Sequence, residues 1–316
     1  MYPLRRLLPA LWLAAAVLIP ARVRADETVK VLFSDPDSQL LSVLEGLKAT
    51  METIRPVEMV SLPSDRETLK EQLQALNRSK PPLAIAIGTR AALVAREFLA
   101  DVPMLFTYAV DNSTTQLRGP RMRGVNFTIR AQEQVQILRR IYPGLRRLGV
   151  VYNPSNSGFE VNWMEEAAKE AGISLLKFRV DVDQDIERAL TSLTGKIDML
   201  WIPDDPMILR VENLREILRF SLRDNTPLYT FSPVHVNAGA ALSLSPSGRA
   251  AGTQLAVMAS KVLLGTPVDQ LPMEWPKTYE IGLNLAILKR IGRLEDVGIN
   301  ALVYTAEGKH DVKIVR

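Results

Sequence analysis

The sequence predicts an α/β fold of two lobes, each with a parallel β-sheet covered by helices. Short apolar stretches alternate with amphipathic helical patterns along most of the chain, which is typical of parallel sheets. Some stretches, such as residues 83–87 and 199–202, are apolar throughout, as strands covered on both faces should be. About 290 residues follow a leader segment, roughly twice a typical domain, which favours two lobes over one wide sheet.

The first lobe is predicted to contain a series of strand–helix units. Its helices begin after small polar residues, as where Ser64-Asp65 precedes an amphipathic pattern. The apolar runs predict strands at residues 29–33, 57–62, 83–87, 103–107 and 124–127. The amphipathic patterns predict helices at residues 40–53, 66–77, 89–99 and 131–141.

The cycle restarts after Tyr142-Pro143-Gly144, a natural break between lobes. Strands are predicted at residues 148–152, 174–180, 199–202 and 228–231, and helices at residues 159–171, 186–193 and 211–223. The rest of the chain predicts a strand at 240–244, a helix at 248–264, a proline-rich crossing at 266–276, an apolar segment at 279–283, a short helix near 284–291 and a hairpin-like tail. We expect these last pieces to pass between the lobes and to form part of a hinge.

Residues 1–25 have the features of a signal peptide. Arg5 and Arg6 precede an apolar stretch at residues 7–21, and Val23-Arg24-Ala25 ends in a small residue suited to signal peptidase. The stretch is short for a membrane span, which needs about 20 apolar residues, although an uncleaved anchor is the alternative. Cleavage after about Ala25 predicts a protein exported to the bacterial periplasm.

Charge and cysteine content narrow the function classes. Four of the 39 basic residues lie in residues 1–25, which hold no acidic residue, so the mature chain has as many basic as acidic residues. The arginines near residues 118–123 and 139–147 fall in a loop and around a helix end, not in one patch with aromatic partners, so we expect no nucleic-acid partner. The chain has no cysteine and must fold without disulfides.

Polar turns follow the predicted strands, and open parallel sheets bind ligands at the carboxyl ends of their strands. If the lobes face each other through these edges, the turns line one cleft. The candidate ligand-binding residues are Asp35, Gly88, Thr89, Tyr108, Asp111, Asn153, Ser155, Asn156, Asp204, Asp205, Phe231 and Ser232.

Several candidates suit a small ligand that carries both charges. Backbone N–H groups at Gly88 and the hydroxyl of Thr89 suit a carboxylate, and Ser155 and Asn156 offer similar groups from the other lobe. Helix capping is the alternative for these small polar residues.

The remaining candidates suit an ammonium group or an apolar side chain. Asp204 or Asp205 could accept hydrogen bonds from an ammonium group, the other being a turn or cap residue, and Asp111 and Asp35 are weaker candidates. The rings of Tyr108 and Phe231 could stack on a ligand, with buried packing as the alternative. Trp163 and Trp201 are expected to be core or helix-face residues.

Catalysis has little support in the sequence. The two histidines, His235 and His310, are far apart, and there is no cysteine nucleophile, Gly-x-Ser-x-Gly elbow, phosphate loop or metal-ligand spacing. We therefore expect no enzyme activity, no cofactor and no bound metal.

Motifs along most of the mature chain match those of a known family in order and spacing. The matching stretches are Ile87-Gly88-Thr89, residues 102–106, residues 149–156, Ile202-Pro203-Asp204-Asp205, residues 248–267 and Tyr279-Glu280 with Asn284. Together they resemble ABC-transporter substrate-binding proteins of the periplasmic type I class, in the branch with tryptophan- and tyrosine-binding members. The resemblance implies two Rossmann-like lobes with parallel sheets, a hinge and a cleft that captures a small solute, and it favours Asp204 over Asp205 as the binding residue. The chain departs from the family pattern at residues 107–112 and 231–235, which leaves the identity of the ligand open.

We therefore expect a monomeric periplasmic receptor for a small-molecule ligand that delivers it to the membrane permease and ATPase of an ABC importer, and the resemblance favours an amino acid as the ligand. A purine, a peptide-like solute and a sugar-like solute stay open. The alternatives are an exported binding module that feeds a sensor kinase or regulator, and an exported α/β enzyme. The expected lobes are residues 26–144 with about 243–268, and residues 145–242 with about 269–316.

Overall fold

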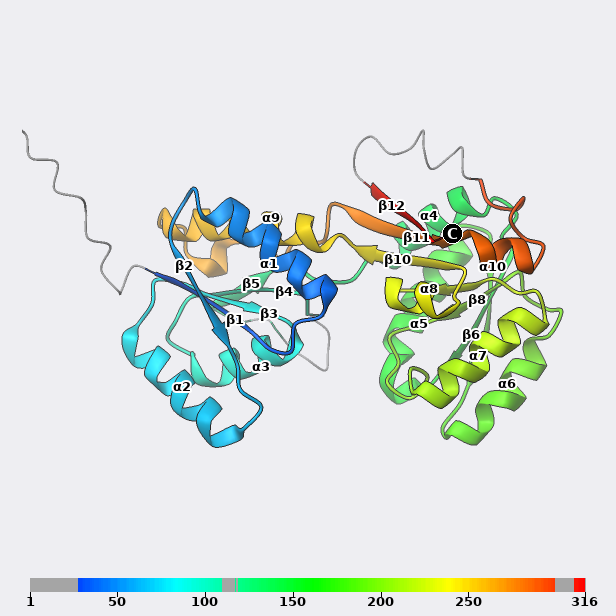
Figure 1. Ribbon diagram of the computed structural model, residues 1–316, viewed down its shortest axis with the longest axis horizontal. Helices are drawn as coiled ribbons and strands as arrows, with labels where there is room; N and C mark the ends of the chain where they lie inside the picture. The colour runs from blue at the N-terminus through cyan, green and yellow to red at the C-terminus, as the bar shows by residue number, and fades with distance from the viewer. Residues whose placement is uncertain (1–27, 110–116, 118, 299–309, 316) are drawn as a thin grey trace, which may run out of the picture.

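The computed structural model contains two α/β lobes, each built on one β-sheet (Figure 1). It describes residues 28–109, 117, 119–298 and 310–315. The predicted signal peptide at residues 1–25 and the candidate residue Asp111 lie outside these ranges. Within them, every helix falls short of the length and apolar character needed to cross a membrane.

The first lobe has a five-stranded sheet in the order β2-β1-β3-β4-β5, and all its neighbouring strands are parallel. Buried apolar side chains cover both faces of this sheet. Its strands are β1 (Val29–Phe33), β2 (Val57–Ser61), β3 (Ala84–Ile87), β4 (Met104–Thr107) and β5 (Met122–Gly124). Its helices are α1 (Ser38–Met51), α2 (Arg66–Ser79), α3 (Thr89–Phe98), α9 (Gly248–Leu263) and the 3₁₀ helix η3 (Val268–Gln270).

The second lobe has a seven-stranded sheet in the order β12-β11-β10-β9-β8-β6-β7. Its strands are β6 (Arg147–Tyr152), β7 (Ser174–Arg179), β8 (Met199–Ile202), β9 (Leu228–Thr230), β10 (Leu242–Pro246), β11 (Tyr279–Asn284) and β12 (His310–Val315). Its helices are α4 (Ala131–Ile141), α5 (Pro154–Glu170), η2 (Asp183–Asp185, a 3₁₀ helix), α6 (Ile186–Leu193), α7 (Val211–Arg223), α8 (Pro233–Ala238) and α10 (Leu285–Arg290).

One strand pair departs from the expected parallel arrangement. β10 and β11 are antiparallel, whereas β11 and β12 are parallel, so β12 does not form a hairpin with β11. The reason lies in the chain path: after β10 the chain enters the first lobe as α9, and it returns to the second sheet as β11 in the opposite direction (Figure 1).

Two helical segments differ from their predictions. α5 begins at Pro154 instead of residue 159, because the side chain of Asn153 caps the helix by accepting a hydrogen bond from the backbone N–H of Ser155, and proline suits the first helical turn. The candidate residue Ser232, expected in a polar turn after a strand, is the N-cap of α8, which begins at Pro233. Both starts combine a polar cap with proline at the next position.

Helices α1 and α9 cross closely in the first lobe, although about 200 residues separate them in the sequence (Figure 1). Gly252 makes this possible, because a Cβ atom there would collide with the carbonyl oxygen of Val43 and lie 2.7 Å from the backbone nitrogen of Leu47. A late segment of the chain therefore completes the core of the first lobe.

Three stretches of chain connect the lobes: between β5 and α4, between β10 and α9, and between η3 and β11 (Figure 1). We propose a division that follows the two sheets. The sequence assigned α4 and β10 to the first lobe, and this division assigns both to the second. Helix α4 shares a core with α5 and β6, and β10 pairs with β9 and β11.

Candidate ligand-binding cleft

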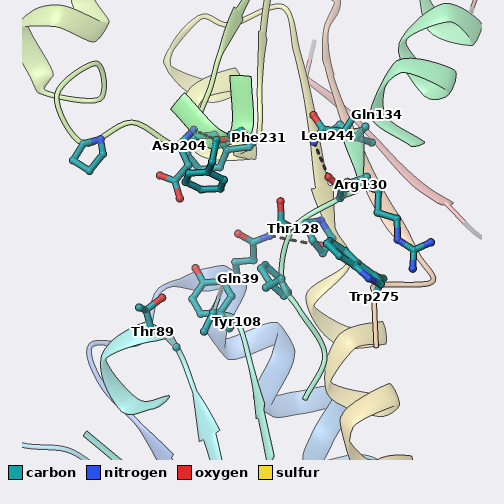
Figure 2. A pocket seen from close by; sticks show the side chains of 18 of the residues that line it. Gln39, Thr89, Tyr108, Thr128, Arg130, Gln134, Asp204, Phe231, Leu244 and Trp275 are labelled. Carbon is teal, nitrogen blue, oxygen red and sulfur yellow. Dashed lines mark hydrogen bonds between the residues drawn. The ribbon is translucent and has the colours of Figure 1, made fainter. Parts of the chain in front are cut away.

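A cavity of about 610 Å³ lies between the two lobes, at the ends of the strands where the polar turns were predicted. The first lobe contributes Ser34, Asp35, Gln39, Leu40, Gly88, Thr89, Arg90, Tyr108, Ala109 and Phe127. The second lobe contributes Gln134, Ser155, Asn156, Phe159, Glu160, Trp163, Met164, Asp204, Pro206, Phe231 and Leu244. The chain crossings contribute Thr128, Ile129, Arg130 and Trp275, and Ala131 of α4 and Pro246 of β10 lie at their ends. Figure 2 shows Thr89 and Tyr108 on one side of this cleft and Asp204 and Phe231 on the other.

The N-terminus of α3 forms part of the first lobe's wall. Gly88 precedes the helix with φ of 100°, in a region that favours glycine, and it makes no side-chain cap. Thr89 is the first helical residue, and its side chain is exposed at the cleft. The capping alternative for Thr89 is therefore wrong. The first N–H groups of a helix lack intrahelical partners and attract anions, so this corner suits a carboxylate.

Tyr108 is held against the cleft by two contacts. Its hydroxyl donates a hydrogen bond to Oδ2 of Asp37 at 2.6 Å, and its ring packs edge-to-face on Phe127 with centroids 4.8 Å apart. Desolvation, and then the bond to the Asp37 carboxylate, raise the pKa of the Tyr108 hydroxyl. Tyr108 and Asp35 both have positive φ, at 57° and 43°, and Asp35 is exposed at the cleft edge.

The second lobe's wall begins at the N-terminus of α5. Ser155 and Asn156 are exposed at the cleft, in the first turn of the helix. Asn153 lies outside the cavity lining: its side chain caps α5 and donates a hydrogen bond to the carbonyl of Val180 at 3.1 Å. We assign Asn153 a structural role in place of the predicted contact.

The two neighbouring aspartates have different environments. Asp205 is fully buried, and its carboxylate accepts hydrogen bonds from the Asn153 backbone, the Asn156 amide and the Ser157 hydroxyl at 2.7–3.0 Å. Asp204 is exposed at the cleft, where desolvation and then the charge of Asp205 raise the pKa of its carboxyl group. The geometry therefore gives Asp205 a structural role and leaves Asp204 facing the cavity.

Sequence reasoning missed Glu160, which lies one helical turn after Asn156 on α5. Desolvation is the main reason that its pKa is raised to about 8, and the charges of Asp204 and Asp205 add to the effect. Its Oε2 accepts a hydrogen bond from the backbone N–H of Asp204 at 3.3 Å, which opposes the shift. The helical spacing of Asn156, Glu160 and Met164 was the signal that could have located this residue.

Aromatic rings surround much of the cleft. Trp163 lies on a face of helix α5, as expected, but the sequence did not predict that this face, where Trp163 is 48% exposed, lines the cavity; Trp201 is buried as expected. Phe159 packs edge-to-face on Trp163, with centroids 5.3 Å apart. The ring of Phe231 makes a similar contact with His235 at 5.4 Å.

Ser232, the residue after Phe231, is not part of the cavity lining. It serves as the N-cap of α8, where its hydroxyl accepts a hydrogen bond from the backbone N–H of Val234 at 3.4 Å. Of the twelve candidates, the described residues in the lining are Asp35, Gly88, Thr89, Tyr108, Ser155, Asn156, Asp204 and Phe231.

The third side of the cleft is the hinge. The guanidinium of Arg130 stacks over the ring of Trp275, 4.9 Å from its centroid, and so joins two of the three crossings (Figure 2). Gln39 of α1 donates a hydrogen bond to the carbonyl of Pro246, at the end of β10, across 3.4 Å. These contacts connect elements of both lobes beside the cavity.

Among the described residues, no group of three or more His, Asp or Glu side chains is placed to hold a metal ion. His235 bonds through Nδ1 to the hydroxyl of Thr230 at 2.7 Å, and desolvation lowers the pKa of its ring.

Comparison with known proteins identifies a family and a relative of this chain. A family model described as ABC transporter substrate binding protein matches residues 36–303. The tyrosine-binding protein of Clostridioides difficile is 22% identical over 243 residues, which cover 74% of this chain and 70% of that protein.

Solved structures of similar fold include two with closely matching length. A ligand-free, open substrate-binding protein with adhesive properties from Clostridium difficile aligns with a TM-score of 0.76 at 19% identity, covering 92% of this chain and all of the other. A Streptococcus pneumonia domain in complex with L-Trp aligns with a TM-score of 0.63 at 20% identity, covering 87% of this chain and 99% of the other.

These matches confirm the predicted fold class and the family resemblance. The matching family is one of substrate-binding proteins, so the chain is a binding protein and not an enzyme. Because the family match covers residues 36–303, most of the chain and all three crossings, the chain belongs to the ABC transporter substrate binding proteins.

Proposed function

We propose that this chain is the receptor of an ABC importer and that it captures an amino acid between its lobes by hinge closure. One observation carries the proposal: across a single cavity, a helix N-terminus at Gly88 and Thr89 faces a carboxylate, Asp204. An amino acid has one charged group for each. Its carboxylate would meet the N–H groups of α3, and its ammonium group would meet Asp204.

The lining favours an amino acid with a large, apolar side chain. Rings of Tyr108, Phe127, Phe159, Trp163 and Phe231 border the cavity, and offset or edge-on packing of aromatic rings stabilises a complex beyond simple burial. The relative named as a tyrosine-binding protein and the related structure with L-Trp support an aromatic ligand.

Closure follows from the placement of the binding groups on both lobes. A ligand shifts an equilibrium between open and closed forms only if it makes better contacts in one of them. A ligand that bridges α3 and the Asp204 loop would make both sets of contacts in the closed form, which is the hinge motion common to such receptors.

Export and partners complete the proposal. The leader at residues 1–25 supports export to the periplasm with cleavage after about Ala25, and the absence of cysteine suits a fold that forms without disulfides. In this role the closed, monomeric receptor delivers its ligand to a membrane permease, whose ATPase supplies the energy for import.

Ligand identity and the role of Asp204 can be tested together. Mass spectrometry of ligand extracted from freshly purified protein is expected to identify an amino acid, and calorimetry to show its binding. Asp204→Asn should weaken that binding by about 1–3 kcal/mol, because it removes the charge that pairs with the ammonium group. Asp181→Asn, on the exposed surface of the same lobe, is the matched control and should bind as the unmodified protein does.

Two outcomes would each contradict a different part of the proposal. Unchanged affinity in Asp204→Asn would reject the ammonium contact, and recovery of a sugar or purine would reject the ligand class. Deleting the gene in the source bacterium should abolish uptake of the identified ligand, whereas normal uptake in the deletion strain would contradict the importer role.

A further inference from the structure

Glu160 is a carboxyl group in the cleft for which the proposed function gives no role. It lies on α5 between Phe159 and Trp163, and all three border the cavity. Its Oε2 is 3.3 Å from the backbone nitrogen of Asp204, so the two acidic side chains belong to the same corner. In the part of the chain that the structure describes, Glu160 forms no ion pair with a Lys, Arg or His side chain.

The groups that act on Glu160 come from several elements. Asp204 and Asp205 follow β8, and both repel a negative charge on Glu160. Desolvation, and then the negative charge of Glu160, raise the pKa of the Tyr229 hydroxyl on β9. This hydroxyl donates a hydrogen bond to Gln134 at 2.5 Å. Arg130, a basic residue of the cavity lining, stacks on Trp275.

Asp205 cannot relieve this crowding by binding the ligand itself. Its Oδ1 accepts hydrogen bonds from the Asn156 amide and from the backbone N–H groups of Met207 and Ile208, and its Oδ2 accepts two more. Glu160 and Asp204 are therefore the two carboxyl groups of this corner that border the cavity. A single ammonium group, with three N–H donors, suits such a pair.

We propose that Glu160 is the second carboxyl group of the ammonium subsite and that it releases a proton to solvent when the ligand binds. The O–H bond of the Glu160 carboxylic acid breaks, the proton passes to the buffer, and the resulting carboxylate pairs with the ligand's ammonium group beside Asp204. The inference rests on the proposed function, because it requires a ligand with a cationic group.

The direction of the pH effect follows from the raised pKa of Glu160, about 8 in the empty cleft. Below that pH the empty protein holds the proton, and an approaching cation lowers the pKa. Binding then releases a proton, so affinity rises as the pH rises towards 8 and levels off above it. Desolvation lowers the pKa of the His235 ring, so this group of the same lobe stays neutral in this range.

A first experiment needs no ligand. In the full mature protein, the ¹³C carboxyl resonance of Glu160, assigned by its absence in Glu160→Gln, is expected to titrate near pH 8. Titration near the ordinary glutamate value of about 4.3 would overturn the inference and leave the proposed function standing.

A second experiment measures proton release by calorimetry with L-tyrosine and L-tryptophan in buffers of different ionisation enthalpy. We expect close to one proton released per ligand at about pH 6.5, and an affinity roughly twentyfold higher at about pH 8.5. Glu160→Gln should release none and should bind equally at both pH values. Glu166→Gln, an exposed residue of the same helix, should behave as the unmodified protein does.

The outcomes distinguish a failure of the Glu160 role from a failure of the proposed function. Proton release that persists in Glu160→Gln would overturn the role of Glu160 while amino-acid binding stands. The proposed function fails if neither amino acid binds and the ligand extracted from the protein has no ammonium group. This inference then fails with it.

Discussion

The hydroxyl of Ser157 donates a hydrogen bond to Oδ2 of Asp205 across 2.7 Å, and this bond joins the first turn of α5 to the loop after β8. Asn153 and Asn156 bond to the same carboxylate from the same segment of chain. Because Asp205 is fully buried and its oxygens are already bonded, it holds two walls of the cleft in place, and Asp204 is left at the surface of the cavity.

Asp205→Ala is expected to lower the free energy of unfolding by about 3 kcal/mol, because several buried donors lose their acceptor. Urea denaturation followed by circular dichroism would measure this loss. Asp204→Ala is the control and should leave the free energy of unfolding unchanged or slightly higher, because it removes a charge from beside Asp205. An equal loss in both variants would contradict the structural role of Asp205.

Stability of the empty protein should fall as the pH rises from about 5 to 8 through the ionisation of Glu160. The folded protein holds the proton up to about pH 8, whereas an unfolded glutamate releases it near pH 4.3, so the folded state binds more protons in this window and loses stability with rising pH. Glu160→Gln should remove roughly 2–4 kcal/mol of that fall. Urea midpoints measured across this range would test it, and parallel curves for the variant and the unmodified protein would refute it.

Gly252→Ala should destabilise the protein by about 1–3 kcal/mol, since the added methyl group meets backbone atoms of Val43 and Leu47 on α1. Gly158→Ala is the matched control, a helical glycine of α5 whose added Cβ would lie 3.8 Å from Pro154. It should leave stability unchanged or raise it by up to about 1 kcal/mol. Thermal unfolding would distinguish the two, and a tolerated Gly252→Ala would show that α1 and α9 can separate without cost.

Tryptophan fluorescence should report ligand binding through Trp163 and Trp275, the two described tryptophans that line the cavity. Trp163 is 48% exposed at the cleft, whereas Trp201 is buried in the second lobe's core, so closure over a ligand changes the surroundings of Trp163 far more than those of Trp201. Trp163→Phe is expected to lose part of the ligand-induced emission change and Trp201→Phe to retain all of it. The reverse pattern would place closure elsewhere than over α5.

The order of strands and helices was accessible from the sequence because it depends on local patterns. Continuous apolar runs located β3 and β8, and amphipathic periodicity located α4, α6 and α7 with their observed bounds. The antiparallel pairing of β10 and β11 could not be predicted in this way. Helix α9 lies between these strands in the sequence but packs in the first lobe, and this path sets the direction of β11. The short helix α8 has too few turns to show a periodic pattern.

The residues that line the cleft could be predicted from the sequence where they follow a strand, but not where they lie elsewhere. The rule that ligands bind beyond the carboxyl ends of parallel strands located Thr89, Tyr108 and Asp204 in the lining. It does not cover a helix face or a chain crossing, which is where Glu160 and Trp275 lie. It also could not separate Asp204 from Asp205, because only packing shows which carboxylate is enclosed.

The position of α9 has a consequence for how the protein matures. Leu255, Ala256 and Ala259 of this helix fill the core of the first lobe beside Val29 and Val43. A polypeptide that emerges N-terminus first has therefore synthesised most of the second lobe before the first can close. Translocation of an unfolded chain across a membrane would benefit from this delay, because no early fragment can become a stable, compact obstacle.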